Sequence, residues 1–304
     1  MFKKSYLEKY NEEHSSVAAS LIVNKKIFIR FLSICICSIL YLIIFALSKV
    51  NGSHDIQTQF VNTFVNTIMV CSFILSFLFI VGYILYRFVP SVNKILDELS
   101  FKIKKTIFIV LDWLVILPVC ATIACFSFAF VFTFAQVDGE SMYPTVSNDA
   151  TVFVSYLEKI EKFDIVVAYI TEEDSCLESL TSYQRASYPE YYIKRVIGMP
   201  GDSVTWIDGV LRINNQVIDE FYFDNYTKLD LKATWTTSTG FYGEFQYKEN
   251  GVINKTYIIP DGYYFVMGDH RDVSVDSRRI GLIPEKNIEG VVKFEFGDSG
   301  IVRF

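Results

Sequence analysis

The chain has 304 residues, of which 51% are hydrophobic and 16% aromatic, and its formal net charge is −6. This apolar content is typical of membrane proteins. The acid excess lies in residues 135–304, which hold 27 Asp and Glu against 16 Lys and Arg. Because nucleic acid is bound by basic surfaces, we expect no nucleic-acid partner.

Three long apolar runs occupy the first half of the chain, at about residues 27–47, 64–86 and 107–134. Each has about the 20 residues that a helix needs to cross a lipid bilayer. They predict a membrane anchor of three transmembrane helices over residues 27–134, preceded by a short segment, residues 1–26. A cleavable signal peptide is the alternative for the first run, but the length of the run and of its leader favours a retained helix. The third run carries Asp112, which we expect near the membrane interface, because a charge inside the bilayer is costly.

The positively charged residues predict the orientation of this anchor. Lys and Arg cluster before the first run and between the second and third, whereas the loop between the first and second holds only Lys49. Because Lys and Arg are enriched on the cytoplasmic side, we expect the N-terminus in the cytoplasm and residues 135–304 outside. The sequence therefore predicts a multi-pass protein of the cell membrane, in contact with the lipid bilayer.

A short polar stretch, Asp138–Val146, follows the last apolar run directly. Its Ser141 lies between Gly139 and Pro144, which favour a tight, irregular turn. Such a turn can expose a hydroxyl and point a backbone N–H at the same spot, the arrangement that a nucleophilic serine uses. An ordinary turn leaving the membrane is the alternative.

Residues 135–304 predict an antiparallel all-β domain. Short runs of β-branched and aromatic residues are broken by turn residues, and we expect strands at Thr151–Tyr156, Asp164–Ile170, Tyr191–Ile197, Ser203–Ile207, Val210–Ile213, Thr256–Ile259, Tyr263–Met267 and Gly290–Phe296. Asp208-Gly209, between two of these runs, predicts a tight hairpin. Two stretches, near residues 171–189 and 221–254, have the composition of insertions.

Cysteine and histidine positions argue against a disulfide or metal in this domain. Cys176 is its one cysteine, and the other five cysteines fall in the apolar runs. His14, His54 and His270 lack the spacing of metal ligands. We therefore expect no metal ion and no other cofactor.

The segment Tyr191–Val204 holds a second candidate residue for catalysis. Side chains alternate along a strand, so Lys194 and Arg195 point to opposite faces, and one of them faces inward if the strand packs on the core. Arg keeps its charge in almost every environment, whereas burial lowers the pKa of a lysine until it loses its proton. Lys194 is thus the better candidate for a neutral amine. A half-buried lysine whose tip reaches solvent is the alternative.

A polar loop follows the strand that is expected to end near Met267. Asp276 and Arg278 are spaced to form an ion pair, and Ser274 is able to hydrogen-bond a neighbouring amine. Taken alone, this loop needs no function.

Together these segments resemble the bacterial type I signal peptidases, the membrane-bound leader peptidases of the serine–lysine class. Residues 141–145, Ser-Met-Tyr-Pro-Thr, are similar to the family's Ser-Met-x-Pro-Thr motif, and residues 194–202 to its lysine motif. Gly268-Asp269 with residues 274–278 is similar to its last motif. Residues 163–167 match a weaker strand motif without its glycine.

The resemblance implies a signal-peptidase-like β fold and the activity of a serine endopeptidase. Ser141 would be the nucleophile and Lys194 its general base. Ser274 would hold the lysine amine, and Asp276 with Arg278 would brace the site.

Five further residues follow from the same resemblance. The backbone N–H of Ser141 would bind the oxyanion, and Gly139 stands where some members add a serine hydroxyl. Asp269 would support the last motif. Met142, Tyr143 and Tyr192 are candidate substrate contacts, for which ordinary packing is the alternative.

The implied substrates are preproteins with a signal peptide, cut after small residues at positions −3 and −1, in transient contact with the secretion machinery. Two alternatives stay open: a dedicated processing peptidase for one surface or pilus protein, and a membrane-anchored β domain that binds a partner without chemistry. The joint presence of Ser141, Lys194 and Ser274 favours an enzyme.

The sequence departs from the family pattern at His270, where Asn is usual, and at Val273, where several members have a polar residue. Histidine is the base in eukaryotic and archaeal relatives, so His270 is an alternative base. The intact lysine motif favours Lys194.

Overall fold

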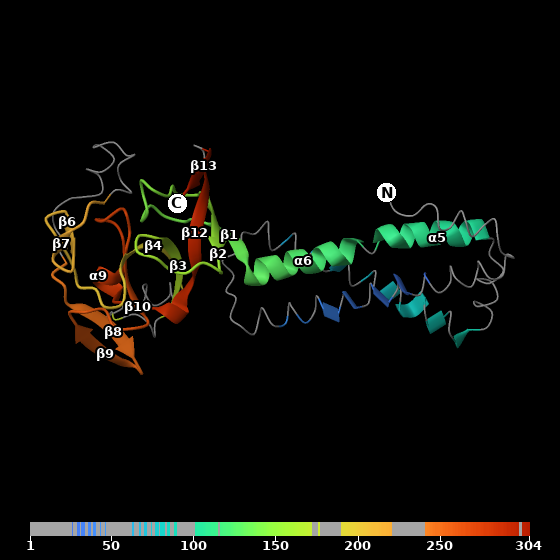
Figure 1. Cartoon of the computed structure of the whole chain (residues 1–304), viewed down its shortest axis with the longest axis horizontal. Coiled ribbons are helices and arrows are strands. Elements are labelled where there is room, and N and C mark those ends of the chain that lie inside the picture. The colour runs from blue at the N-terminus through green and yellow to red at the C-terminus, as the bar shows by residue number, and fades with distance from the viewer. Residues whose placement is uncertain are drawn as a thin grey trace. The chain divides into compact units, whose positions relative to one another are not determined.

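The computed structural model describes residues 101–114, 116–171, 176, 190–220, 241–297 and 300–304, together with individual residues between Lys26 and Val89. The chain divides into two compact units, one formed by residues 1–53 and 59–129 and the other by residues 54–58 and 130–304. Figure 1 shows the helices and strands of both.

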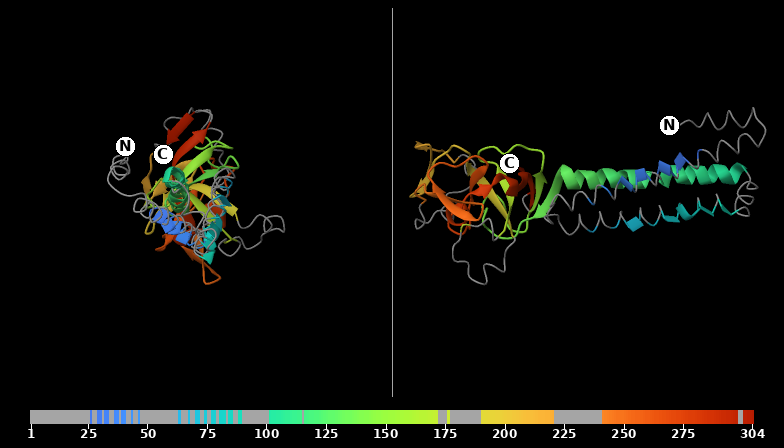
Figure 2. Two further views of the ribbon diagram at one scale, coloured as in Figure 1. Left: turned by 90° about the vertical axis from the view of Figure 1, so that its right-hand side faces the viewer. Right: turned by 90° about the horizontal axis from the view of Figure 1, so that it is seen from below.

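The first unit is helical where it is described. Helices α5 (Phe101–Leu114) and α6 (Ile116–Phe130) follow one another in nearly the same direction (Figure 2). Arg30 Nη2 pairs with Asp112 Oδ1 at 2.6 Å, and Thr122 Oγ1 donates to the carbonyl of Cys37 at 3.3 Å. Polar contacts therefore link both helices to the segment around residues 30–37.

The predicted membrane spans are only partly covered by the described residues. Most of 27–47 and 64–86 lies outside them, and the individual residues described in these two ranges are helical. Within the described part of the chain, no helix combines the length and the apolar character needed to cross a membrane.

The predicted end of the third membrane helix, at residue 134, was wrong. Helix α6 ends at Phe130, and strand β1 (Phe132–Gln136) begins two residues later instead of the helix continuing to residue 134. Strand β1 pairs antiparallel with β2 (Thr151–Ser155) along its whole length. A continuous apolar run does not distinguish a helix from a strand, and here pairing with β2 decides.

The second unit is built on an antiparallel sheet, as the sequence predicts. Its strands follow the order β1-β2-β12-β3-β4-β10-β11, with β13 beside β12. Every neighbouring pair is antiparallel. The bounds of the strands not yet given are β3 Ile165–Ile170, β4 Glu190–Gly198, β10 Tyr263–Met267, β11 Ile283–Pro284, β12 Ile288–Gly297 and β13 Gly300–Arg303.

Two small sheets complete this unit. One contains β5 (Val204–Ile207), β6 (Val210–Ile213) and β7 (Gln216–Val217), and the other is the hairpin of β8 (Phe245–Glu249) and β9 (Val252–Thr256). The predicted hairpin at Asp208-Gly209 is confirmed. Ile207 pairs with Val210, and the two turn residues have φ of 51° and 75°, as a two-residue turn of this kind requires.

One predicted strand, Thr256–Ile259, was wrong. Strand β9 ends at Thr256, and Ile259 instead exchanges hydrogen bonds with a loop, donating to Asp202 and accepting from Gly201. The predicted insertion near 221–254 contains β8 and most of β9, while residues 221–240 lie outside the described part. Of the insertion near 171–189, the structure describes Thr171 and Cys176.

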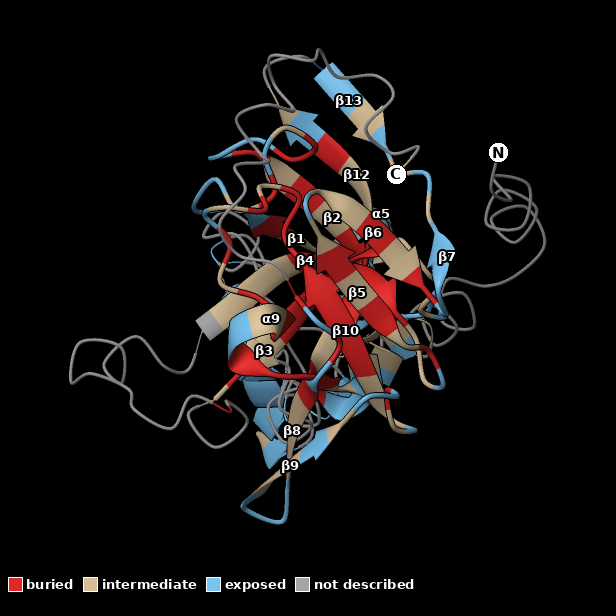
Figure 3. Ribbon diagram, turned by 90° about the vertical axis from the view of Figure 1, so that its left-hand side faces the viewer, coloured by how far each residue is buried: buried red, intermediate tan, exposed pale blue. Residues whose placement is uncertain are grey.

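Strand β4 is covered on both faces, and this positions the site. Val196 and Ile197, two consecutive residues of β4, are both fully buried but belong to different apolar clusters. Val196 packs with residues of β3 and β10, and Ile197 packs with residues of β5, β6 and β10. Figure 3 shows the buried residues concentrated along β4, β5 and β10. Both Lys194 and Arg195 are therefore buried, at 3% and 4% exposure, whereas the alternation of side chains along the strand required only one of them to face inward.

Strand β12 carries a carboxyl whose titration affects stability. Burial raises the pKa of Glu289 from 4.5 to about 7. Between these pH values the folded protein binds more protons than the unfolded chain, so stability falls as the pH rises through this window. We expect Glu289→Gln to raise the melting temperature at pH 8 more than at pH 4.5, measured by thermal denaturation. Glu249→Gln, an exposed position on β8, is the control, and an equal effect of Glu289→Gln at both pH values would contradict the argument.

Candidate active site

The turn that carries Ser141 follows β1 directly and is as irregular as predicted. Gly139 has φ of 103°, and the Tyr143–Pro144 peptide bond is cis. The N–H of Gly139 donates to Asn148 Oδ1 at 2.7 Å, which closes the turn. Met142 and Val146, inside the same turn, are fully buried in the core, so the hydroxyl of Ser141 is held on a well-packed loop.

Ser141 and Lys194 meet, although 53 positions separate them in the sequence. Lys194 Nζ lies 2.7 Å from Ser141 Oγ and 2.8 Å from the carbonyl oxygen of Ile193. The ring of Tyr192 lies 5.2 Å from the same nitrogen. A buried amine in contact with a serine hydroxyl is the arrangement that lets a lysine act as base towards a serine.

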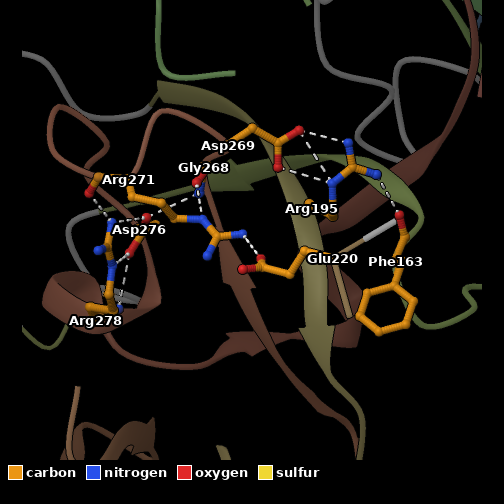
Figure 4. A network of polar contacts seen from close by, with 8 residues as sticks. All are labelled: Phe163, Arg195, Glu220, Gly268, Asp269, Arg271, Asp276 and Arg278. Carbon is orange, nitrogen blue, oxygen red and sulfur yellow. Dashed lines mark hydrogen bonds and ion pairs between the residues drawn. The ribbon is translucent and has the colours of Figure 1, made fainter. Parts of the chain in front are cut away.

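Next to Lys194, each of the three nitrogens in the guanidinium of Arg195 donates a hydrogen bond. Its Nε donates to Asp269 Oδ1 at 2.9 Å, and its Nη2 donates to Asp269 Oδ2 at 2.6 Å. Its Nη1 donates to the carbonyl of Phe163 at 2.8 Å. Asp269 is fully buried, so this pair joins β4 to the end of β10 inside the protein (Figure 4).

The predicted pair of Asp276 and Arg278 is confirmed. Arg278 Nε and Nη2 each donate to one oxygen of Asp276, both at 2.8 Å, and the N–H of Gly268 donates to Asp276 Oδ2 at 3.0 Å. Burial alone would raise the pKa of Asp276, but the hydrogen bonds and charge of Arg278, with the Gly268 N–H, lower it below its usual value. Asp276 also caps helix α9 (Ser277–Ile280).

The loop between β10 and α9 approaches the nucleophile turn very closely at Gly268. A methyl group at this position would collide with Ser274 Oγ and with the carbonyl oxygen of Ser141. Ser274 is 2% exposed, and its N–H donates to the carbonyl of His270 at 3.0 Å. Ser274 is thus in the site, while its contact with the amine of Lys194 remains a prediction.

The three candidate substrate contacts lie in different environments. Met142 is completely buried within the apolar cluster of β2 and β3, which favours its packing role. Tyr143 is 38% exposed, and its ring lies 6.1 Å from the ring of His270. Tyr192 is half-buried beside Lys194. Tyr143 and Tyr192 therefore remain candidates for substrate contact.

Two residues of the site were missed by the sequence analysis, Arg271 and Glu220. The side chain of Arg271 is buried, its Nε donates to the carbonyl of Gly268 at 3.1 Å, and its Nη2 pairs with Glu220. Arg278 Nη2 donates to the carbonyl of Arg271 at 2.6 Å. The two guanidinium groups stack over the ring of Trp206, at 5.8 Å and 5.3 Å. Nothing in the sequence pairs Arg271 with Glu220, because the two are 51 positions apart.

Metal-binding geometry is not found among the described residues, where no three His, Cys, Asp or Glu side chains gather around one point. The carboxylates of Asp269, Asp276 and Glu220 are each paired with an arginine. The site therefore combines a serine hydroxyl, a buried amine and three ion pairs.

Comparison with known proteins shows the family of the chain. Residues 110–296 match the family "Signal peptidase, peptidase S26". The chain is 34% identical to signal peptidase IB of Staphylococcus aureus (strain COL), over 62% of this chain and 89% of that protein. It is 32% identical to signal peptidase I of Streptococcus pneumoniae (strain ATCC BAA-255 / R6), over 61% of this chain and 91% of that protein. A crystal structure of a signal peptidase I from Enterococcus faecalis V583 aligns with 44% of this chain and 97% of its own at 26% identity and a TM-score of 0.28. The chain belongs to the signal peptidase family, peptidase S26.

Proposed function

We propose that this protein is a serine endopeptidase of the signal peptidase I type, which removes signal peptides from secreted preproteins, with Ser141 as nucleophile and Lys194 as general base. Membership of the signal peptidase family supports the activity. The observation that carries the assignment of residues is the 2.7 Å distance between Lys194 Nζ and Ser141 Oγ. A β domain that only binds a partner has no use for this contact.

The reaction follows from the two groups. As Ser141 Oγ attacks the scissile carbonyl carbon, its proton passes to the neutral amine of Lys194, and a tetrahedral oxyanion forms. When the C–N bond breaks, the ammonium returns this proton to the leaving amine, and an acyl-serine remains. Lys194 then takes a proton from water as the water oxygen attacks the ester carbon. When the ester C–O bond breaks, the ammonium gives this proton to Ser141 Oγ, and the released carboxylic acid loses its own proton to solvent.

The surroundings of Lys194 favour its neutral form. Removal of an amine from water disfavours its charged state, and Lys194 is 3% exposed. The carboxylates of Asp269 and Asp276 are each engaged by an arginine, at 2.6 Å and 2.8 Å. The charges of Asp269 and Asp276 are thus balanced by partners that keep their own charge, which leaves the lysine to exchange a proton.

The three apolar runs and the distribution of Lys and Arg support a location in the cell membrane, with the N-terminus in the cytoplasm and residues 135–304 outside. Because Ser141 lies close in sequence to the end of the third apolar run, it would meet the cleavage sites of preproteins at the outer surface of the bilayer. Transient contact with the secretion machinery and a preference for small residues at −3 and −1 belong to the same proposal. A dedicated peptidase for one surface or pilus protein would use the same chemistry.

A cleavage assay tests this proposal. We expect the purified protein in detergent to cut a labelled preprotein with Ala at −3 and −1, and a matched preprotein with Trp at −1 to be cut at least about 100-fold more slowly, because a pocket shaped for a methyl group excludes an indole. N-terminal sequencing of the product identifies the bond. Equal cleavage of both preproteins would contradict the substrate assignment, and no cleavage of either would contradict the function.

A further inference from the structure

The side chain of His270 reaches across to the turn that carries the nucleophile. His270 lies in the loop between β10 and α9, and its Nδ1 is 3.1 Å from the carbonyl oxygen of Glu140. A carbonyl oxygen only accepts hydrogen bonds, so Nδ1 carries the proton and donates it. The ring of Tyr143 packs beside the imidazole, with ring centres 6.1 Å apart.

The same residue holds the turn a second time through its backbone. The N–H of His270 donates to the carbonyl oxygen of Ser141 at 3.1 Å. Two consecutive carbonyls, of Glu140 and Ser141, are therefore bound by one residue of the opposite loop. The carbonyl of Glu140 also accepts the N–H of Tyr143 at 3.1 Å, so both of its lone pairs are used.

The carbonyl of Glu140 and the N–H of Ser141 belong to one peptide group. A trans peptide group is planar, and its C=O and N–H point in opposite directions. A bond that holds the oxygen of Glu140 towards the imidazole consequently aims the N–H of Ser141 away from it. A hydrogen bond received by a carbonyl also polarises the amide, which makes its N–H a stronger donor.

We propose that the imidazole of His270 is a positioning residue that aims the Ser141 N–H at the oxyanion. This inference rests on the proposed function, in which that N–H is an oxyanion donor. Oxyanion donors are effective because they are oriented before the reaction begins, and loss of one costs about 100- to 1,000-fold in kcat. A donor that is present but no longer held in direction loses part of this factor. His270 therefore acts on kcat without touching the substrate.

Four variants test the role of the side chain while the backbone bond of His270 is kept. His270→Ala removes the donor, and His270→Phe removes the donor but retains a ring next to Tyr143. His270→Asn places an amide nitrogen at the same number of bonds from Cα as Nδ1, so it can donate to Glu140. Val273→Ala, at an exposed position of the same loop, is the control.

We expect kcat to fall about 10- to 100-fold in His270→Ala and His270→Phe, with KM and the melting temperature unchanged. We expect His270→Asn to recover most of kcat and Val273→Ala to match the parent protein. Steady-state cleavage of a labelled preprotein by the full chain in detergent gives both constants.

Several results would overturn the inference. A parental kcat in His270→Ala would show that the bond is not needed, and a parental kcat in His270→Phe would assign the effect to ring packing. A loss of activity in His270→Asn as deep as in His270→Ala, with Lys194→Met still active, would make the histidine a base. Ser141→Ala separates this inference from the proposed function: if Ser141→Ala is inactive and His270→Ala is not impaired, only the inference fails, whereas an active Ser141→Ala ends both.

Discussion

We expect Ser141→Ala and Lys194→Met each to lower kcat/KM for a labelled preprotein by about 10⁴-fold or more, because in the proposed mechanism each removes one half of the group that attacks the peptide bond. Methionine retains the apolar stem of the lysine side chain and removes only the amine. Both positions are surrounded by packed side chains, with Met142 next to Ser141 and Val196 near Lys194 fully buried. We therefore expect both variants to fold, which near-parental melting temperatures would show.

The double variant Ser141→Ala/Lys194→Met gives the sharper result. Residues that act as one unit lose their activity together, so the double variant should be no slower than the slower single variant. If the two losses multiply, the side chains act independently and the proton transfer between them is refuted. Lys255→Met is the matched control, because Lys255 is an exposed lysine paired with Glu244 at 2.9 Å. Its rate should equal that of the parent protein.

Local patterns predicted most of the strands correctly and failed where pairing partners decide. Val210–Ile213 and Tyr263–Met267 were predicted with their observed bounds, since alternation and turn residues define such strands. The first three residues of β1, Phe132–Phe134, were assigned to a helix because the apolar run continues without a break from α6. Only its pairing with β2 makes this segment a strand. Such pairing joins two segments that are separated in the sequence, so neither segment alone predicts it.

The site shows the same division between local and distant information. Ser141, Lys194 and the Asp276–Arg278 pair were found from motifs, and the last is local because its two residues are two positions apart. The ion pair between Arg271 and Glu220 was not found, although it is buried in the loop that braces the site. The sequence of a polar loop does not show whether a charged side chain in it is buried. The burial of Arg271 depends on residues distant in the sequence, Trp206 and Glu220.

Strand β4 places the buried ion pair of Arg195 directly beside Lys194, the proposed general base. Arg195 keeps its charge in any environment, so at 4% exposure it requires Asp269, which is fully buried. Lys194 is equally buried, and in the proposed mechanism it is the residue of the two that exchanges a proton.

Asp269→Ala should consequently cost about 3–5 kcal/mol of stability, because it leaves the guanidinium of Arg195 buried without a partner. Glu244→Ala is the matched control: it breaks the exposed pair with Lys255, which should cost less than about 1 kcal/mol. Thermal and chemical denaturation measure both. A loss of stability in Asp269→Ala no larger than in the control would contradict the structural role of the buried pair.

The double variant Arg195→Met/Asp269→Leu then separates stability from catalysis. Apolar side chains of similar volume remove both charges together, so most of the lost stability should return. Activity should recover less, because the pair also sets the position of β4 beside β10, and a shift of about 1 Å at Lys194 costs about 100-fold in rate. If activity returned in full with stability, the ion pair would serve folding alone, and the 2.7 Å contact between Lys194 and Ser141 would depend on packing rather than on Asp269.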